Sequence, residues 1–203
     1  MSNISINIKG IGEHDFKNGV TPLEIMSETK GISSDSIICK VDGVLTDLSA
    51  SLSSNCELQF MDAKSKDGHS VLLHSTAHLM AQAVKRLFPK TKVTIGPFLE
   101  NRFYYDFDVE TPFTEYDLLK IEEEMLKISE ENLSILHQTK SQTEAVKFFE
   151  SINETYKVEI INDLGEDETL KVYSQGEFTD LCRGPHVPST GVIKHFKLLA
   201  SSA

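Results

Sequence analysis

The dipeptide Asp42-Gly43 lies between two short apolar runs and is the feature that most constrains how this chain folds. The flanking runs are Ile37–Val41 and Val44–Leu48. A two-residue loop of Asp and Gly favours a tight β-hairpin, because both turn positions need positive φ. The sequence therefore predicts an antiparallel strand pair around this turn.

The first sixty residues have the pattern of a small, self-contained unit. Polar and apolar residues alternate along Ile4–Ile8, as in a strand with one buried face. Thr21, Pro22 and Glu24 form a helix start, in which Thr caps, Pro occupies the first turn and Glu closes a capping box. A last strand at Leu58–Met61 completes the order strand, strand, helix, paired strands, strand.

The polar stretch Lys64–Gly68 is typical of a linker, so we expect one domain at 1–63 and a larger one at 64–203. Apolar residues at helical spacing predict a helix over 72–88, which Pro89 ends. Capping boxes at Thr114 and Ser141 predict two more helices. The strand candidates are Phe103–Phe107, Tyr156–Ile161, Leu170–Ser174 and Phe178–Leu181. The predicted fold class is α+β, with a mainly antiparallel sheet and packed helices in the larger domain.

Composition limits the class of protein. The chain has 203 residues, a formal net charge of −11 and three cysteines. Cys39 lies in an apolar run and Cys56 begins the stretch Cys56–Phe60, and we expect both to pack in strands. Few cysteines, no signal peptide and no long apolar run predict a cytoplasmic protein. The negative charge argues against nonspecific binding to a polyanion. Basic residues still gather at 85–92 and 194–197, as a solvated surface or a local RNA contact.

Two pairs of potential ligand residues lie four positions apart. His74 and His78 share one side of the predicted helix, at the edge of its apolar face. Cys182 follows a strand, alternation puts Asp180 on the same face, and a Gly-Pro turn returns His186 toward them. Such a set could bind a tetrahedral zinc or form a metal-free polar site. Ser, not Glu, follows the first histidine, so the helix lacks the general base of a zinc protease.

Four stretches carry a family resemblance. HSTAHLMAQAVKRLFP, IGPFLENRFYYDFD, YKVEI and DLCRGPHVPSTGVIKHFKLL together resemble the editing domain of threonyl-tRNA synthetases. The first sixty residues resemble the TGS domain, a ubiquitin-like β-grasp module that precedes it. Alanyl-tRNA synthetase editing domains are similar in their His and Cys pairs but lack the TGS domain. Because the sequence stops at Ala203, the resemblance implies an excised N-terminal fragment or a stand-alone editing factor, without the aminoacylation core.

The resemblance implies proofreading hydrolysis of seryl-tRNA(Thr). A site that selects threonine rejects serine poorly, because one methyl group is worth only about 1–3 kcal/mol. By position in the motifs, the residues with catalytic roles are His74, Lys157, Asp180 and Cys182. The residues with substrate-binding roles are His78, His186, Gly96 and Tyr105. We expect Lys157 and His74 to organise the attacking water and the ribose hydroxyls, and Gly96 and Tyr105 to line the pocket for serine or the terminal adenosine.

The resemblance also implies the cofactors and partners. Editing is expected to need no metal, and the alternative is a zinc held by His74, His78, Cys182 and His186. ATP and a synthetic-site zinc would belong to the absent core. The expected partner is tRNA(Thr) carrying serine at its 3′ end, with no membrane and a monomeric fragment. The rival functions are a zinc-dependent alanyl-tRNA-type deacylase and a noncatalytic RNA-binding module.

Overall fold

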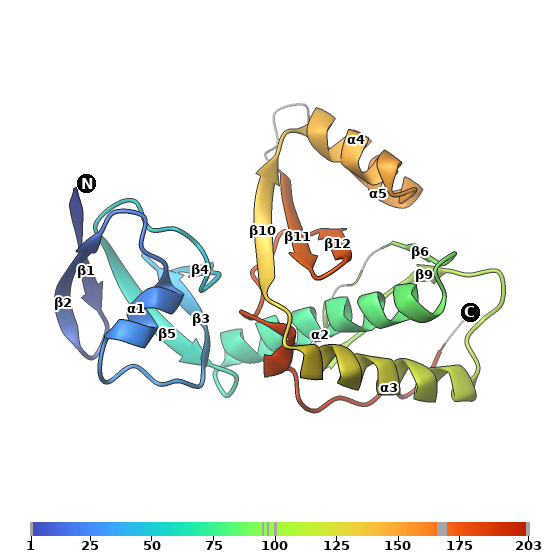
Figure 1. Cartoon of the computed structure of the whole chain (residues 1–203), viewed down its shortest axis with the longest axis horizontal. Coiled ribbons are helices and arrows are strands. Elements are labelled where there is room, and N and C mark those ends of the chain that lie inside the picture. Colours follow the sequence, from blue (N-terminus) through green and yellow to red (C-terminus); the bar gives the residue numbers. More distant parts are fainter. Residues whose placement is uncertain (1, 95, 97, 100, 166–169, 202–203) are drawn as a thin grey trace. The chain divides into compact units, whose positions relative to one another are not determined.

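The chain folds into two units, shown as ribbons in Figure 1. The computed structural model describes residues 2–94, 96, 98–99, 101–165 and 170–201. The first unit consists of Met1–Leu72 with Pro185–Pro188, and the second of Leu73–Gly184 with Ser189–Ala203. The division into domains at 1–63 and 64–203 stays a prediction.

The first unit is a five-stranded sheet with one helix. The strands are β1 (Asn3–Ile8), β2 (Gly12–Lys17), β3 (Ser36–Val41), β4 (Val44–Thr46) and β5 (Cys56–Asp62). Their order is β2-β1-β5-β3-β4, in which β1 and β5 are parallel and the other neighbours antiparallel. Helix α1 (Pro22–Glu28) begins at the predicted capping box and packs Ile25 into the core of the unit. The hairpin at Asp42-Gly43 is confirmed, with φ values of 48° and 83°.

The second unit combines helices with antiparallel strands. Its helices are α2 (Lys66–Leu87), which begins in the first unit, α3 (Glu115–Glu131), α4 (Gln142–Ser151), α5 (Thr155–Asn162) and the 3₁₀ turn Thr190–Val192. Its main sheet has the order β10-β11-β12, formed by Ile135–Lys140, Leu170–Gln175 and Phe178–Leu181. Two short pairs are β6 (Lys92–Val93) with β9 (Phe107–Asp108), and β7 (Phe98–Leu99) with β8 (Arg102–Phe103).

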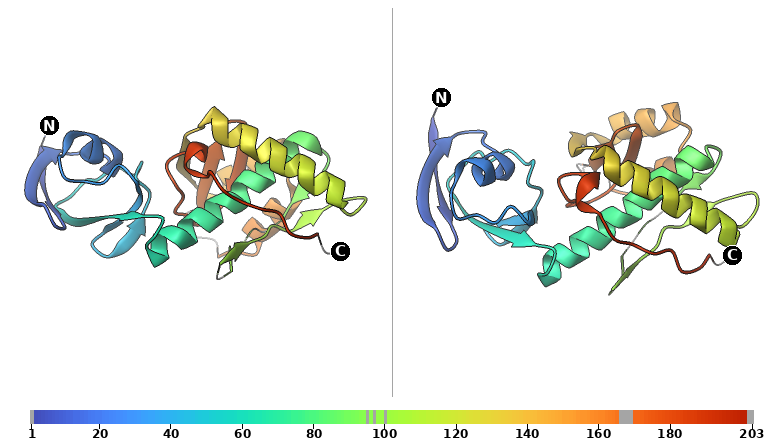
Figure 2. Two further views of the ribbon diagram at one scale, coloured as in Figure 1. Left: turned by 90° about the horizontal axis from the view of Figure 1, so that it is seen from below. Right: turned by 60° about the horizontal axis from the view of Figure 1, so that its bottom comes forward.

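Helix α2 is central to the second unit. It lies beside α3 in every view, and Figure 1 shows the β10–β12 sheet on its other side. The C-terminal segment runs along α3 (Figure 2): Ser129 Oγ donates to the Ile193 carbonyl at 2.7 Å, and Lys197 Nζ lies 2.6 Å from Glu122 Oε2. The predicted fold class, α+β with mainly antiparallel strands, is confirmed.

Three sequence predictions of secondary structure are wrong in part. Tyr156–Ile161 is not a strand: it forms most of α5, which buries Lys157 and Ile161, four residues apart, on one face. In Phe103–Phe107 only the two end residues belong to strands, β8 and β9. Within Lys64–Gly68, α2 already begins at Lys66, so the linker is shorter than expected.

Within the described part of the chain, none of the helices is both long and apolar enough to cross a membrane.

Candidate functional site

A buried ion pair joins α5 to β12. Lys157 Nζ lies 2.6 Å from Asp180 Oδ1, and the two side chains are only 3% and 2% exposed. The same Nζ donates to the Thr94 carbonyl at 2.6 Å and to the Tyr105 hydroxyl at 3.2 Å. A lysine ammonium has three N–H donors, and the three acceptors match them. Lys157 therefore anchors a buried polar cluster inside the second unit.

Asp180 accepts further hydrogen bonds on both carboxylate oxygens. Its Oδ2 accepts from the Tyr105 hydroxyl at 2.6 Å, and its Oδ1 accepts from the Leu181 backbone N–H at 2.8 Å. Burial, and then the Asp180 charge, raise the pKa of Tyr105 well above 10, so the phenol stays protonated and donates. The carboxylate is thus fixed in orientation by groups from three separate segments.

His78 lies near the same Asp180 oxygen that accepts from Tyr105. Its Nε2 lies 3.6 Å from Asp180 Oδ2. Burial lowers the pKa of His78 well below 6.5, and the neighbouring His74 and Lys157 act in the same direction. The imidazole is consequently neutral at pH 7.

His74 contacts Cys182 one helical turn earlier. The Nε2 of His74 and the Sγ of Cys182 are 3.1 Å apart, and the Gly184 backbone N–H donates to the same sulfur at 3.3 Å. The His74 and His78 rings meet edge to face, with centroids 5.1 Å apart. Ligand atoms of His74, His78 and Cys182 all lie within 4.8 Å of one another. Two imidazoles and a thiol are a donor set that suits zinc, so these three residues could hold a metal ion.

The contact of His74 with Cys182 and the contact of His78 with Asp180 follow from matched spacings along the two segments. Moving four residues along α2, from His74 to His78, advances about 6 Å along the helix axis. Moving two residues back along the chain, from Cys182, which directly follows β12, to Asp180 within it, covers about 6.6 Å at the rise of an extended strand. The spacing of four in one motif therefore matches the spacing of two in the other, which brings both pairs into register.

His186 lies in the segment Pro185–Pro188, which belongs to the first unit. Its backbone N–H donates to Asp47 Oδ1 of that unit at 2.8 Å. The other seven predicted site residues belong to the second unit.

Gly96 supports Tyr105 by having no side chain. A Cβ at this position would overlap the Tyr105 ring, at both Cδ2 and Cε2. Tyr105 itself is only 7% exposed. The glycine is therefore required for the close approach that lets the Tyr105 hydroxyl reach Asp180.

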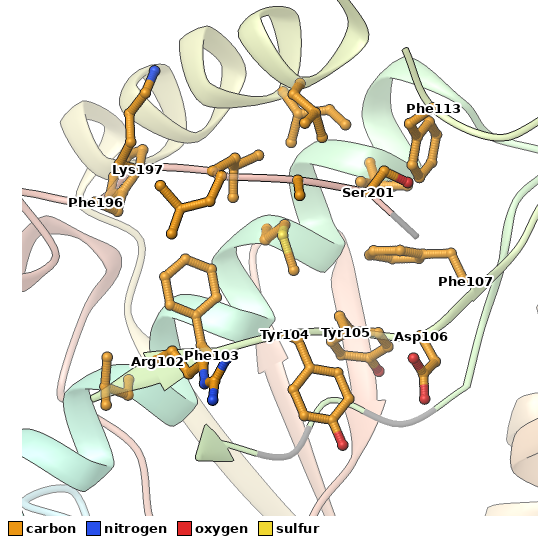
Figure 3. Close-up of a pocket in the computed structure, with 18 of the residues that line it drawn as sticks. Arg102, Phe103, Tyr104, Tyr105, Asp106, Phe107, Phe113, Phe196, Lys197 and Ser201 are labelled. Atoms are coloured by element: carbon orange, nitrogen blue, oxygen red, sulfur yellow. The ribbon is translucent and has the colours of Figure 1, made fainter. Parts of the chain in front are cut away.

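Tyr105 also borders a cavity of about 940 Å³ (Figure 3). Most of its walls are aromatic and aliphatic, and part of the lining comes from the C-terminal segment His195–Ser201. The Tyr105 and Phe107 rings stack there, with centroids 5.0 Å apart and 22° between their planes. One tyrosine thus presents its ring to an apolar cavity and its hydroxyl to the polar cluster.

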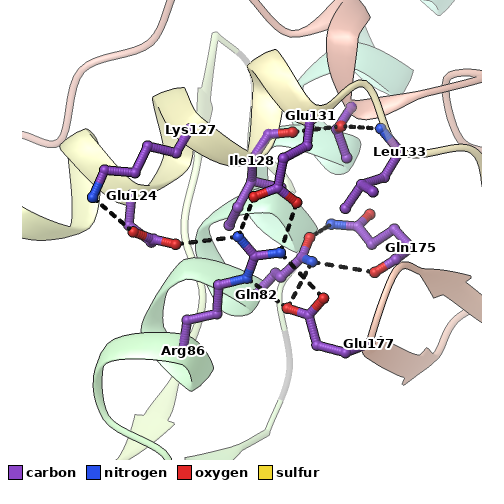
Figure 4. Close-up of polar contacts among 10 residues, drawn as sticks. Gln82, Arg86, Glu124, Lys127, Ile128, Glu131, Leu133, Gln175 and Glu177 are labelled. Carbon is purple, nitrogen blue, oxygen red and sulfur yellow. Dashed lines mark hydrogen bonds and ion pairs between the residues drawn. The ribbon is translucent and has the colours of Figure 1, made fainter.

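A second polar network, shown in Figure 4, was not predicted from the sequence. Gln82 Nε2 donates to the Gln175 carbonyl at 3.2 Å and to Glu177 Oε1 at 3.0 Å, and Gln175 Nε2 donates back to Gln82 Oε1 at 2.8 Å. Arg86 pairs with Glu124, Glu131 and Glu177, each with a closest distance of 3.2 Å or less. The only available sequence signal is the spacing, since Gln82 and Arg86 continue the stripe of His74 and His78 in steps of four.

Three of the four basic residues at 85–92 have partners within the unit. Arg86 is held by three carboxylates, and Lys85 Nζ lies 2.7 Å from the buried Glu154. Lys92 Nζ donates to the Asn153 carbonyl. These three side chains have structural partners, so the cluster is not simply a solvated surface.

Comparison with known proteins defines the class first. Residues 170–203 match the family described as "Threonyl and Alanyl tRNA synthetase second additional domain". These residues include β11, β12, Asp180, Cys182 and His186. The β11–β12 hairpin and the segment after it, which carry Asp180, Cys182 and His186, are therefore similar to a domain described for two kinds of aminoacyl-tRNA synthetase.

Similarity over the whole chain is more specific. The chain is 48% identical over 187 residues to the threonine–tRNA ligase of Symbiobacterium thermophilum, covering 92% of this chain and 29% of that protein. It is 47% identical over 201 residues to the Pelobacter propionicus threonine–tRNA ligase (98% and 31%). With the Rickettsia canadensis threonine–tRNA ligase the identity is 42% over 197 residues (97% and 31%). The chain is a homologue of part of the threonine–tRNA ligases, and it spans 29–31% of the length of these relatives.

Proposed function

We propose that this chain is an aminoacyl-tRNA ester hydrolase that removes serine from mischarged tRNA(Thr). The observation that carries the proposal is the convergence of His74, Cys182, His78, Asp180 and Lys157 in a homologue of the threonine–tRNA ligases. A single threonine-selecting site rejects serine by only about 10–200-fold, because the two differ by one methyl group. A second site that hydrolyses the wrong ester removes the remaining errors.

We assign different roles to the half-buried and the buried residues. His74 and Cys182 are half-buried and are the residues that the ester meets, whereas Lys157 and Asp180 lie behind them. In this arrangement His74 orients the attacking water and a ribose hydroxyl. Lys157 contributes a fixed positive charge near the reacting carbonyl, and it can bind a hydroxyl directly by exchanging one of its three protein acceptors.

The remaining residues would bind the substrate. His78, held neutral by burial, can donate or accept one hydrogen bond to the amino acid or the ribose. Tyr105, seated against Gly96, bounds the space for serine or the terminal adenosine. His186 is proposed as a further substrate-binding residue, from its place in the motif.

A zinc-dependent deacylase is the second candidate, favoured by the cluster of His74, His78 and Cys182. A bound zinc would supply Lewis acidity toward the ester carbonyl. In that case Asp180 would remain the residue that orients His78. We prefer hydrolysis without an obligatory metal, because the resemblance to threonyl-type editing domains implies a site that works without a tightly held zinc.

We infer a tRNA-related role for the first unit as well. Its five-stranded sheet with β1 parallel to β5 and one packed helix is compatible with a TGS-type β-grasp module. The partner of the whole chain would be tRNA(Thr) carrying serine, in the cytoplasm, and the chain would act as a monomer.

The test is hydrolysis of Ser-tRNA(Thr) and Thr-tRNA(Thr) by the unmutated chain, His74→Ala and the surface control Lys120→Gln, each with and without a chelator. We expect rapid loss of serine only, abolished by His74→Ala, unchanged in the control and indifferent to the chelator. Loss of activity with the chelator would favour the zinc-dependent candidate. Binding of tRNA without hydrolysis would favour the remaining hypothesis, a noncatalytic RNA-binding module.

A further inference from the structure

The register between α2 and the β11–β12 hairpin extends beyond the proposed editing site. Gln82 and Arg86 continue the row of His74 and His78 along α2 in steps of four residues, one and two turns further on, and each step turns the row by about 40° around the helix. Gln82 contacts Gln175 and Glu177, which lie at the turn end of the hairpin. Four residues spaced by one turn along α2 therefore contact the β11–β12 hairpin or the residue directly after it, and only the first two have proposed catalytic or binding roles.

We propose that Gln82 and Arg86 are positioning residues for the proposed editing site. They hold the β11–β12 hairpin in register with α2, and this register sets the contacts of His74 with Cys182 and of His78 with Asp180. The inference rests on the proposed function for its kinetic consequence, but its structural consequence can be measured independently.

Gln82 fixes the hairpin by reciprocal hydrogen bonds. It is fully buried, and Gln175 is 2% exposed. Their side chains are linked at 2.8 Å, and Gln82 reaches both the main chain of Gln175 and the carboxylate of Glu177. A slip of the hairpin by one residue would leave several of these buried groups without partners, which is unfavourable because a buried polar group without a hydrogen bond has lost its hydration with nothing in return.

Arg86 fixes the same end of the hairpin by charge. Its guanidinium donates to Glu177 through Nε at 2.6 Å and Nη2 at 3.1 Å, and to Glu131 through Nη1 at 2.6 Å and Nη2 at 2.9 Å. Glu124 is the third acceptor, at 3.2 Å. Without Arg86, three carboxylates from α3 and the hairpin would face one another and repel. The arginine thus couples α2, α3 and the hairpin at one point.

The decisive variant is Arg86→Gln, with Arg86→Lys as the conservative variant and Lys120→Gln as the matched charge control on α3. The first readout is amide hydrogen exchange at Leu181, whose N–H is bonded to Asp180 Oδ1. We expect exchange at Leu181 and through β12 to rise about tenfold or more in Arg86→Gln, as for loss of about 1.4 kcal/mol of local stability. Arg86→Lys should lie in between, and the control should match the unmutated chain.

The second readout is steady-state hydrolysis of Ser-tRNA(Thr), per folded molecule at low temperature. A displaced catalytic group lowers the rate without changing substrate affinity, so kcat should fall about 10- to 100-fold in Arg86→Gln while KM stays within about twofold. Unchanged exchange at Leu181 and a kcat within about twofold of the unmutated chain would overturn the proposal. A residue with a merely structural role would lower the melting temperature but leave kcat per folded molecule intact.

A second variant and the independence of the two readouts allow the proposal to be tested even if Arg86→Gln does not fold or the unmutated chain is inactive. If Arg86→Gln does not fold, Glu177→Gln removes one side of the same network at a side chain that is 57% exposed, and the same two readouts decide. If the unmutated chain does not hydrolyse Ser-tRNA(Thr), the proposed function fails, and the exchange measurement still tests the positioning of the hairpin.

Discussion

Lys157 and Asp180 form an ion pair that is sealed from solvent, with 2.6 Å between Nζ and Oδ1 and side chains no more than 3% exposed. Breaking one side of such a pair leaves a buried charge without its partner. We expect Lys157→Met to lower the free energy of unfolding by about 3–5 kcal/mol and to abolish hydrolysis. Urea unfolding measures the first effect.

The double variant Lys157→Met with Asp180→Asn provides the control for that prediction. Because it removes both charges, it should be more stable than Lys157→Met alone while remaining inactive. Equal stability of the single and double variants would contradict a charge-based penalty.

Gly96→Ala should damage the site through Tyr105. The added methyl group overlaps the Tyr105 ring, which must move and lose its hydrogen bond to Asp180. We expect a loss of about 1–3 kcal/mol in stability, typical of overpacking, together with a lower kcat for hydrolysis. Gly165→Ala is the matched control, since a Cβ there has no neighbour within 4 Å among the residues that the structure describes. Thermal melts that put the two variants at the same temperature would argue against this role of Gly96.

We expect the pairing of Arg86 with Glu177 to make part of the free energy of unfolding depend on pH in the acid range. Hydrogen bonds from the Arg86 guanidinium, as the largest cause, lower the pKa of Glu177 from 4.5 to about 2. A carboxyl group whose folded pKa is depressed contributes stability that is present above pH 4.5 and is lost as the pH falls toward about 2. In Arg86→Gln, stability should therefore decline less steeply across this window.

The contribution of Glu177 is expected to be modest, because its side chain is 57% exposed and screened by solvent. Denaturant melts at several pH values between 5 and about 2 would measure it. Lys171→Gln, on an exposed position of β11, serves as the control. Parallel stability curves for Arg86→Gln and the unmutated chain would show that this pairing does not affect acid stability.

We expect the thiol of Cys39 to be unreactive in the folded protein. Its side chain is completely buried in the first unit, and burial, with smaller contributions from Asp47 and Cys56, raises its thiol pKa to about 12. Since the thiolate is the reactive form, we expect no labelling of Cys39 by a disulfide reagent at pH 8. Peptide mapping after labelling identifies the site, and denaturation should expose all three cysteines. Rapid modification of Cys39 in the native protein would contradict its burial.

The sequence correctly predicted the helix starts and the hairpin turn that are set by interactions within a few residues. The capping boxes at Thr21, Thr114 and Ser141 all begin helices, and Asp42-Gly43 forms the expected hairpin turn. In each case a side chain bonds to the backbone within three residues, or the turn itself requires positive φ.

The elements that were not predicted correctly from the sequence are those whose conformation depends on packing against distant segments. Tyr156–Ile161 contains β-branched and aromatic residues, which favour a strand, yet α5 forms because its turn buries Lys157 and Ile161 together. Strand β10 was missed, since it is defined mainly by its pairing with β11, about 35 residues away from it in sequence. The partners of Arg86 come from positions 124, 131 and 177, so their meeting cannot be read from any one segment.

The matched steps of α2 and β12 also constrain insertions and deletions. One residue inserted between His78 and Gln82 would rotate the rest of α2 by about 100° and turn Gln82 and Arg86 away from the hairpin. An insertion of a full turn would restore the face but shift it by about 5.4 Å, close to two residues of strand. The number of residues between positions 74 and 86 is therefore as restrictive as their identity, and length variation should be tolerated in surface loops rather than in this part of α2.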